Sequence, residues 1–217
     1  MPDYYYIFKP ILLLSEIMAA LVGLFHLSRL NNCKWKFLVY YLVIIALQET
    51  FWHIDLGFSH TTKQMYYAYF GIPLQYIFLY WLYAIQSLGN KKIFVICLTL
   101  YLFTYIPIEL FFKKLWVVYS LNPTIGTIFL ILLVILEFLK QIKEDSILYF
   151  YRNNMFYINL GVILFYIGTY PFFCFYSLLR KNYLSIWHMY FAYFLVANIL
   201  MYSLFALSFI WGRHHSK

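Results

Sequence analysis

The chain has 217 residues, of which 65% are hydrophobic, 24% aromatic and 11% charged, and its mean hydropathy is +0.74. Soluble domains use roughly 45–50% apolar and about 25% charged residues, so these values exclude an ordinary soluble domain and indicate an integral membrane protein. The formal net charge is +8. In a membrane protein, excess basic residues set the topology and attract anionic lipid headgroups, so we expect contact with the bilayer and no direct contact with nucleic acid.

Seven apolar stretches follow one another along the chain, each near the roughly 20 residues that a helix needs to cross a bilayer. The first stretch is longer than the hydrophobic part of a signal peptide and has no basic flank before it, so we expect it to be a retained helix. The short segments between the stretches leave no room for a soluble domain. We therefore predict an all-α membrane protein, with residues 1–217 forming a single domain of seven transmembrane helices. The predicted spans are 6–28, 36–56, 65–87, 92–112, 116–138, 155–178 and 185–210.

The basic residues also predict the orientation. With the N-terminus outside, most of the 16 Lys and Arg residues fall in the inner loops and the C-terminal tail. Positive residues gather on the cytoplasmic side of membrane proteins, so we predict an external N-terminus and a cytoplasmic C-terminus. The frequent Tyr, Phe, Ile, Asn and Lys residues suggest an AT-rich bacterial genome, and hence a multi-pass protein of the inner membrane.

Glu16 lies near the middle of the first span, in "LLLSEIMAALVGLF". Ser15, Ala19 and Gly23 form a stripe of small residues on this helix, which is typical of close contact between transmembrane helices. A carboxyl group that faces a packed neighbour at this depth should be protonated or paired. We interpret Glu16 either as a functional group or as one partner of a structural hydrogen bond between helices.

The second span ends in "QETFWHID", residues 48–55, after a long apolar run. Glu49 and His53 are four residues apart, so they lie on one face of the helix. A charged carboxylate within the bilayer is costly unless it is paired, protonated or hydrated, which makes Glu49 a functional-site hypothesis. His53 is near enough to the predicted outer boundary to be simply hydrated.

Five further polar residues of the predicted spans fall in the outer half or near mid-membrane, and they are Gln75, Glu109, Asn122, His188 and Asn198. Together with Glu16, Glu49 and His53 they predict a polar, acidic cavity that opens to the outside. On the inner side of the predicted spans we expect only His26, Asn159 and tyrosine hydroxyls. Two of these residues also have an interpretation without a functional role. Glu109 would be hydrated near the interface, and His188, which follows Trp187, would be an interfacial anchor.

Nothing in the sequence indicates a metal, a cofactor or a catalytic motif. The three cysteines lie in or near different helices without metal-binding spacing. The motifs HExxH and GxSxG and a glycine-rich phosphate loop are all missing. We therefore predict a non-enzymatic protein, although an intramembrane hydrolase that uses the predicted carboxyl and imidazole groups for acid–base chemistry stays open.

Two pairs of similar segments predict an internal repeat. "YYAYF" at 66–70 is similar to "YFAYF" at 190–194, and "KPILLL" near the first span is similar to "NPTIGT" in the fifth. These pairs would relate helices 1 and 3 to helices 5 and 7. The arrangement is a parallel repeat of three helices, one connector and three helices, as in some small transporters and receptors.

The segments "FLVYYLVIIALQETF", "YYAYFGIPLQYIFLYWLY", "FYINLGVILFYIGTYPFF" and "ANILMYSLFALSFIW" resemble those of a family of short, uncharacterised bacterial seven-transmembrane-helix proteins. Members of that family are often encoded near sensor kinases, so the resemblance implies a sensing or accessory role. We expect a receptor-like or accessory membrane protein, acting as a homo-oligomer or with a membrane or cytoplasmic partner. Two alternatives are a small-solute transporter and an accessory or effector protein of a CRISPR-type phage-defence system.

Overall fold

The computed structural model describes residues 3–30, 33–54, 57–107, 115–143, 151 and 153–212. Over these residues the regular structure is helical and contains no strand, which confirms the all-α prediction. The main helices are α1 (Asp3–His26), α2 (Cys33–His53), α3 (His60–Tyr66), α4 (Ile72–Tyr80), α5 (Lys91–Phe103), α6 (Tyr105–Pro107), α7 (Leu115–Lys143), α8 (Asn154–Val162), α9 (Tyr170–Cys174), α10 (Tyr176–Asn182) and α11 (Leu184–Trp211). Three π-helical segments interrupt them, η2 (Tyr67–Gly71), η3 (Trp81–Ser87) and η6 (Ile163–Ile167).

Five helical stretches in the described part of the chain are long and apolar enough to cross a membrane. This number supports a multi-pass membrane protein. Of the seven spans predicted from the sequence, five coincide with these helical stretches. The five stretches are Tyr4–His26, His60–Ser87, Leu121–Lys143, Asn154–Cys174 and Leu184–Trp211.

The two remaining predicted spans fall on shorter or more polar helices. The span 36–56 falls on α2, where Lys36 near one end and Gln48, Glu49 and His53 near the other lower the hydropathy of its 21 residues. The span 92–112 falls on α5, which has 13 residues and ends before a turn at Thr104. Residues 108–112 of that span lie outside the described residues.

The chain divides into two compact units. Unit 1 comprises Met1–Asp55, Glu144–Thr169 and Leu184–Lys217, and holds α1, α2, α8, η6 and α11. Unit 2 comprises Leu56–Lys143 and Tyr170–Tyr183, and holds α3 to α7, α9 and α10.

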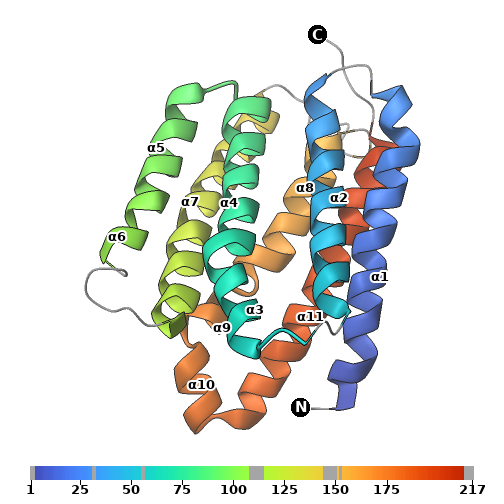
Figure 1. Ribbon diagram of the computed structural model, residues 1–217. Coiled ribbons are helices and arrows are strands. Elements are labelled where there is room, and N and C mark those ends of the chain that lie inside the picture. The colour runs from blue at the N-terminus through green and yellow to red at the C-terminus, as the bar shows by residue number, and fades with distance from the viewer. Residues whose placement is uncertain are drawn as a thin grey trace. The chain divides into compact units, whose positions relative to one another are not determined.

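In unit 1, α1 packs against both α2 and α11, and α8 packs against α11 (Figure 1). Helices α1 and α11 run in the same direction, since the Tyr4 hydroxyl donates to the main-chain oxygen of His188 at 2.7 Å near the start of both. The α1 contacts are close at Gly23, where an added Cβ would lie 3.2 Å from the Val39 side chain and 3.4 Å from that of Phe209. The predicted small-residue stripe thus includes a residue at which α1 closely approaches side chains of α2 and α11.

In unit 2, α4, α5 and α7 pack around a core of tyrosines. The Tyr76 hydroxyl donates to the Pro123 main-chain oxygen at 3.0 Å, and the Tyr80 hydroxyl donates to that of Gly126 at 2.8 Å. Tyr101 on α5 contacts both tyrosine rings at centroid distances of 5.5 and 5.9 Å. The Tyr76 and Tyr80 hydroxyls therefore join α4 to α7 in an apolar environment, where a buried hydroxyl needs a partner.

Candidate functional site

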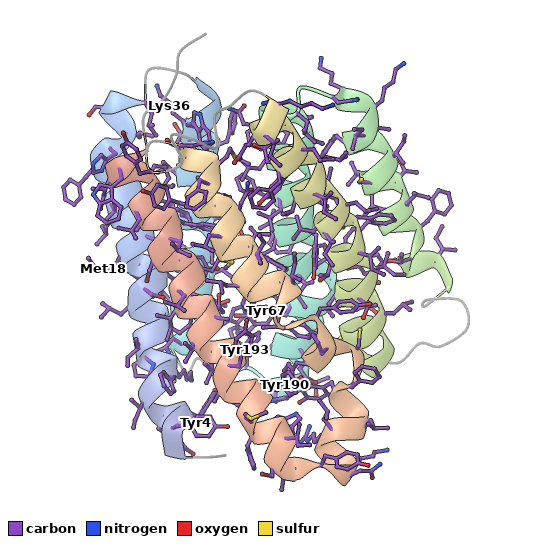
Figure 2. The ribbon with its side chains drawn as sticks, turned by 180° about the vertical axis from the view of Figure 1, so that it is seen from behind. Tyr4, Met18, Lys36, Tyr67, Tyr190 and Tyr193 are labelled. Atoms are coloured by element: carbon purple, nitrogen blue, oxygen red, sulfur yellow. The ribbon has the colours of Figure 1, made fainter. Side chains whose placement is uncertain are left out.

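Glu16 is the buried acidic residue of α1, with 4% of its surface exposed. Figure 2 labels Met18, two residues further on, midway between the two ends of unit 1 that carry Tyr4 and Lys36. Ala19 and Ala20, also buried, lie one turn away on the same face of α1. Small side chains on this face let α2 and α11 approach α1, so the Glu16 carboxyl is enclosed by neighbouring helices.

Glu49, in the last two turns of α2, is half-buried and lies within electrostatic range of Glu16. The adjacent Gln48 is buried, and its Nε2 donates to Glu49 Oε1 at 3.4 Å, the long end of hydrogen-bond distances. The structure therefore places two carboxyl groups from two packed helices near each other.

Three tyrosines complete the surroundings of this carboxyl pair. Tyr41 on α2 and Tyr202 on α11 are buried and lie within electrostatic range of Glu16. Tyr202 is also within range of Glu49 and of the buried Tyr166 on η6. We call Glu16, Glu49, Gln48, Tyr41, Tyr166 and Tyr202 the carboxyl-pair site; all six belong to unit 1.

The Lys and Arg residues that could neutralise two carboxylates are distant along these helices, and His53 is one turn from Glu49 at the end of α2. Residues 10–25 of α1, residues 37–53 of α2 and all of α11 contain no Lys or Arg. Two negative charges in a medium of low polarity repel each other strongly, and each loses hydration. The favourable states of the pair are therefore those in which a proton or a cation compensates at least one charge. A phenol can donate a hydrogen bond to the remaining carboxylate.

The other predicted residues of unit 1 lie elsewhere on its helices. His53 is exposed at the last residue of α2. His188 and Asn198 on α11 are half-buried, and the His188 Nδ1 and Asn198 Oδ1 atoms are buried without a hydrogen-bond partner among the described residues. Of the predicted residues in this unit, the structure places Glu16 and Glu49 within electrostatic range of each other.

The remaining predicted residues belong to unit 2. Gln75 is half-buried in α4. Asn122 is buried in α7, and its Oδ1 accepts a hydrogen bond from Thr104 Oγ1 at 2.8 Å. Glu109 lies outside the described residues. The seven predicted cavity residues that the structure describes are thus divided between the two units.

Sequence reasoning missed several buried polar residues. Tyr41, Tyr166 and Tyr202 were passed over because a chain with 24 tyrosines offers no reason to single out three of them. Glu137 and Gln141 on α7 are buried as well, toward the end of the helix that carries Lys140 and Lys143. This is the end that the topology prediction assigns to the cytoplasmic side, so the contrast between a polar outer half and an apolar inner half does not hold.

Asn159 on α8 is fully buried, and neither its Oδ1 nor its Nδ2 has a hydrogen-bond partner among the described residues. The sequence had marked it only as a polar residue of the inner side.

No protein-family model matches the chain, and a comparison with curated proteins and with solved structures finds no match to it.

Proposed function

We propose that this chain is a multi-pass, receptor-like membrane protein without enzymatic activity, which binds a proton at the carboxyl-pair site. The observation that carries the proposal is the placement of Glu16 and Glu49 within electrostatic range on two packed helices, of which α1 is long and apolar enough to cross a membrane. A proton is the smallest group that removes one of the two charges. It also needs no cavity between packed side chains.

Protonation would alter the packing of three helices. With one shared proton, the carboxyls of α1 and α2 can attract each other, and Tyr202 of α11 lies within range of both. When the proton leaves, two like charges face each other across the α1–α2 contact, and repulsion in a medium of low dielectric favours a looser arrangement. The site thus couples proton binding to helix packing, as a sensing or accessory role would require.

Hydrogen exchange at different pH values tests this proposal. The full chain is reconstituted in liposomes, and exchange in α1, α2 and α11 is compared between mildly acidic and alkaline buffer after correction for the intrinsic pH dependence of exchange. We expect protection in these helices to fall as pH rises, and protection in α4 and α7 of unit 2 to stay unchanged. The double variant Glu16→Gln/Glu49→Gln keeps the side-chain sizes and should abolish the pH effect. An unaltered pH effect in that variant would contradict the proposal.

A small-solute or proton transporter is the second candidate, and Glu137 and Gln141 favour it. A transporter needs polar groups along the whole path across the membrane, and these buried polar residues lie toward the end of α7 that the topology prediction assigns to the cytoplasmic side. Proteoliposomes with an internal pH dye and an imposed pH gradient separate the two candidates. The receptor-like function predicts that the proteoliposomes leak protons no faster than liposomes without protein. A faster leak that Glu49→Gln abolishes would identify a transporter.

A further inference from the structure

A second polar cluster lies in unit 2, where η3 meets α7. Glu137 on α7 is 2% exposed, and its two carboxyl oxygens have different partners. Ser87 Oγ at the end of η3 donates to Oε2, and Gln141 Nε2 donates to Oε1 at 3.0 Å. Both partners are neutral, so the charge of the carboxylate is hydrogen-bonded but not neutralised by them.

The π-helical turn of η3 gathers the side chains around Glu137. A π-helix closes i to i+5 hydrogen bonds, and its wider turn places residues four or five apart on one face. Tyr83 and Ser87 therefore lie on the same side of η3. Such wide turns within helices occur frequently at functional sites.

One oxygen atom of this cluster, the hydroxyl oxygen of Tyr83, lacks a hydrogen-bond partner among the described residues, and the residue is 0% exposed. Tyr83 also lies within electrostatic range of Glu137. Buried polar atoms are rarely left unpaired, and the lone pairs of a phenol oxygen can accept a donor or bind a cation. A cation between this oxygen and the carboxylate would complete the surroundings of both groups.

Lys140 does not fill this role. Its Nζ donates to the main-chain oxygen of Ser87 at 2.6 Å, which ties α7 to the end of η3. The carboxylate itself receives its described hydrogen bonds from Ser87 and Gln141, and none from this ammonium group.

We propose that the Glu137 cluster, consisting of Glu137, Ser87 and Tyr83, binds an alkali-metal cation. All of its available ligand atoms are oxygens, the donor type of hard cations, and it contains no sulfur or imidazole ligand for a transition metal. A single carboxylate matches a single positive charge, whereas Ca²⁺ sites generally use several carboxylates. This site is separate from the carboxyl-pair site, because its residues belong to the other unit.

Thermal unfolding of the purified full-length protein in detergent tests the cation site. Na⁺, K⁺ and Li⁺ chlorides are titrated against choline chloride at constant ionic strength. A ligand that binds only the folded state raises the unfolding midpoint by mass action, so we expect at least one of the three cations to give a saturable rise of about 5 °C. Equal midpoints in all four salts would overturn the proposal.

Four variants assign the effect to the cluster. Glu137→Gln should abolish the rise, and Tyr83→Phe should weaken the apparent cation affinity several-fold. Tyr80→Phe is the matched control, because it removes a tyrosine hydroxyl of unit 2 that bonds Gly126 instead of facing the cluster. It should lower the midpoint in every salt and keep the cation-dependent rise.

The fourth variant, Glu16→Gln/Glu49→Gln, should keep the cation-dependent rise of the midpoint. A rise that is lost in this variant but kept in Glu137→Gln would overturn the proposal. If Glu137→Gln does not fold, Tyr83→Phe decides the question. An undiminished affinity in that variant would then contradict the site.

Discussion

At the residue scale, the carboxyl pair and the tyrosines are the informative groups. Glu16 and Glu49 approach each other in helices that offer them no Lys or Arg over most of their length. Each additional charge in such surroundings costs free energy that hydrogen bonds from phenols only partly offset. The proposed shared proton would offset this cost and would make the contact between α1 and α2 dependent on pH.

The hydroxyl of Tyr76 gives a stability prediction at the same scale. It bonds the Pro123 main-chain oxygen at 3.0 Å and Thr127 Oγ1 at 2.9 Å, and all three residues are buried. Tyr76→Phe leaves these buried groups short of a partner, so it should lower the unfolding free energy by about 1–3 kcal/mol. Chemical unfolding in mixed micelles measures this loss.

The control for that variant is Tyr40→Phe, which changes an exposed tyrosine of α2. Its effect should stay within about 0.5 kcal/mol, as for most surface substitutions. Equal effects of the two substitutions would mean that the Tyr76 hydrogen bonds do not stabilise unit 2.

At the element scale, small residues set how closely the helices pack. Gly23 brings α1 near side chains of α2 and α11, and Gly126 of α7 lies against the ring of Tyr76 in α4. Proline acts on the continuity of the helices. Pro73 is the second residue of α4, which begins where η2 ends, and Pro171 is the second residue of α9, which follows the turn at Gly168 and Thr169. A proline lacks the N–H that a regular α-helix would use, and the preceding wide turn or break accommodates this.

Gly126→Ala tests the contact between α4 and α7. An added Cβ would lie 2.9 Å from two carbon atoms of the Tyr76 ring, and this ring is held in place by its hydroxyl hydrogen bonds. Overpacking of this kind costs about 1–3 kcal/mol, so the thermal midpoint should fall. Leu132→Ala on the exposed face of α7 is the control and should have a smaller effect, because that side chain is 53% exposed in the monomer. A neutral Gly126→Ala substitution would show that α4 and α7 can separate there without cost.

At the scale of the whole molecule, the described part of the chain contains five apolar helical stretches, and the chain divides into two compact units. The predicted topology places the C-terminus in the cytoplasm and the segment before α3 outside. A reporter fused after Lys217 should therefore be active only as a cytoplasmic reporter, and one inserted at Gly57, which is exposed, only as an external one. The opposite pair of results would invert the orientation and place the carboxyl-pair site nearer to the cytoplasmic side.

Part of this picture could be predicted from the sequence. Glu16 could be recognised because a carboxylate within an apolar helix is costly and the neighbouring stripe of small residues signals close packing. Tyr202 could not be recognised in the same way, because the sequence does not distinguish an aromatic residue that faces lipid from one that faces a buried carboxyl group. Glu137 could not be identified from the sequence, because a carboxyl group three residues before Lys140 near the end of a predicted span is equally typical of a hydrated interfacial residue. Assignment of the predicted polar residues to separate units depends on tertiary contacts that periodicity does not reveal.

Infrared difference spectroscopy of the protein in liposomes is the most direct test of the shared proton. Protonated carboxyl groups have a C=O stretching band separate from that of carboxylates, and the chain has only 8 Asp and Glu residues, so the band can be assigned by substitution. We predict a protonated-carboxyl band in the wild type at neutral pH that disappears in Glu16→Gln/Glu49→Gln and persists in Glu137→Gln. A wild-type spectrum without this band, or a double variant that retains all of it, would contradict a proton shared by Glu16 and Glu49.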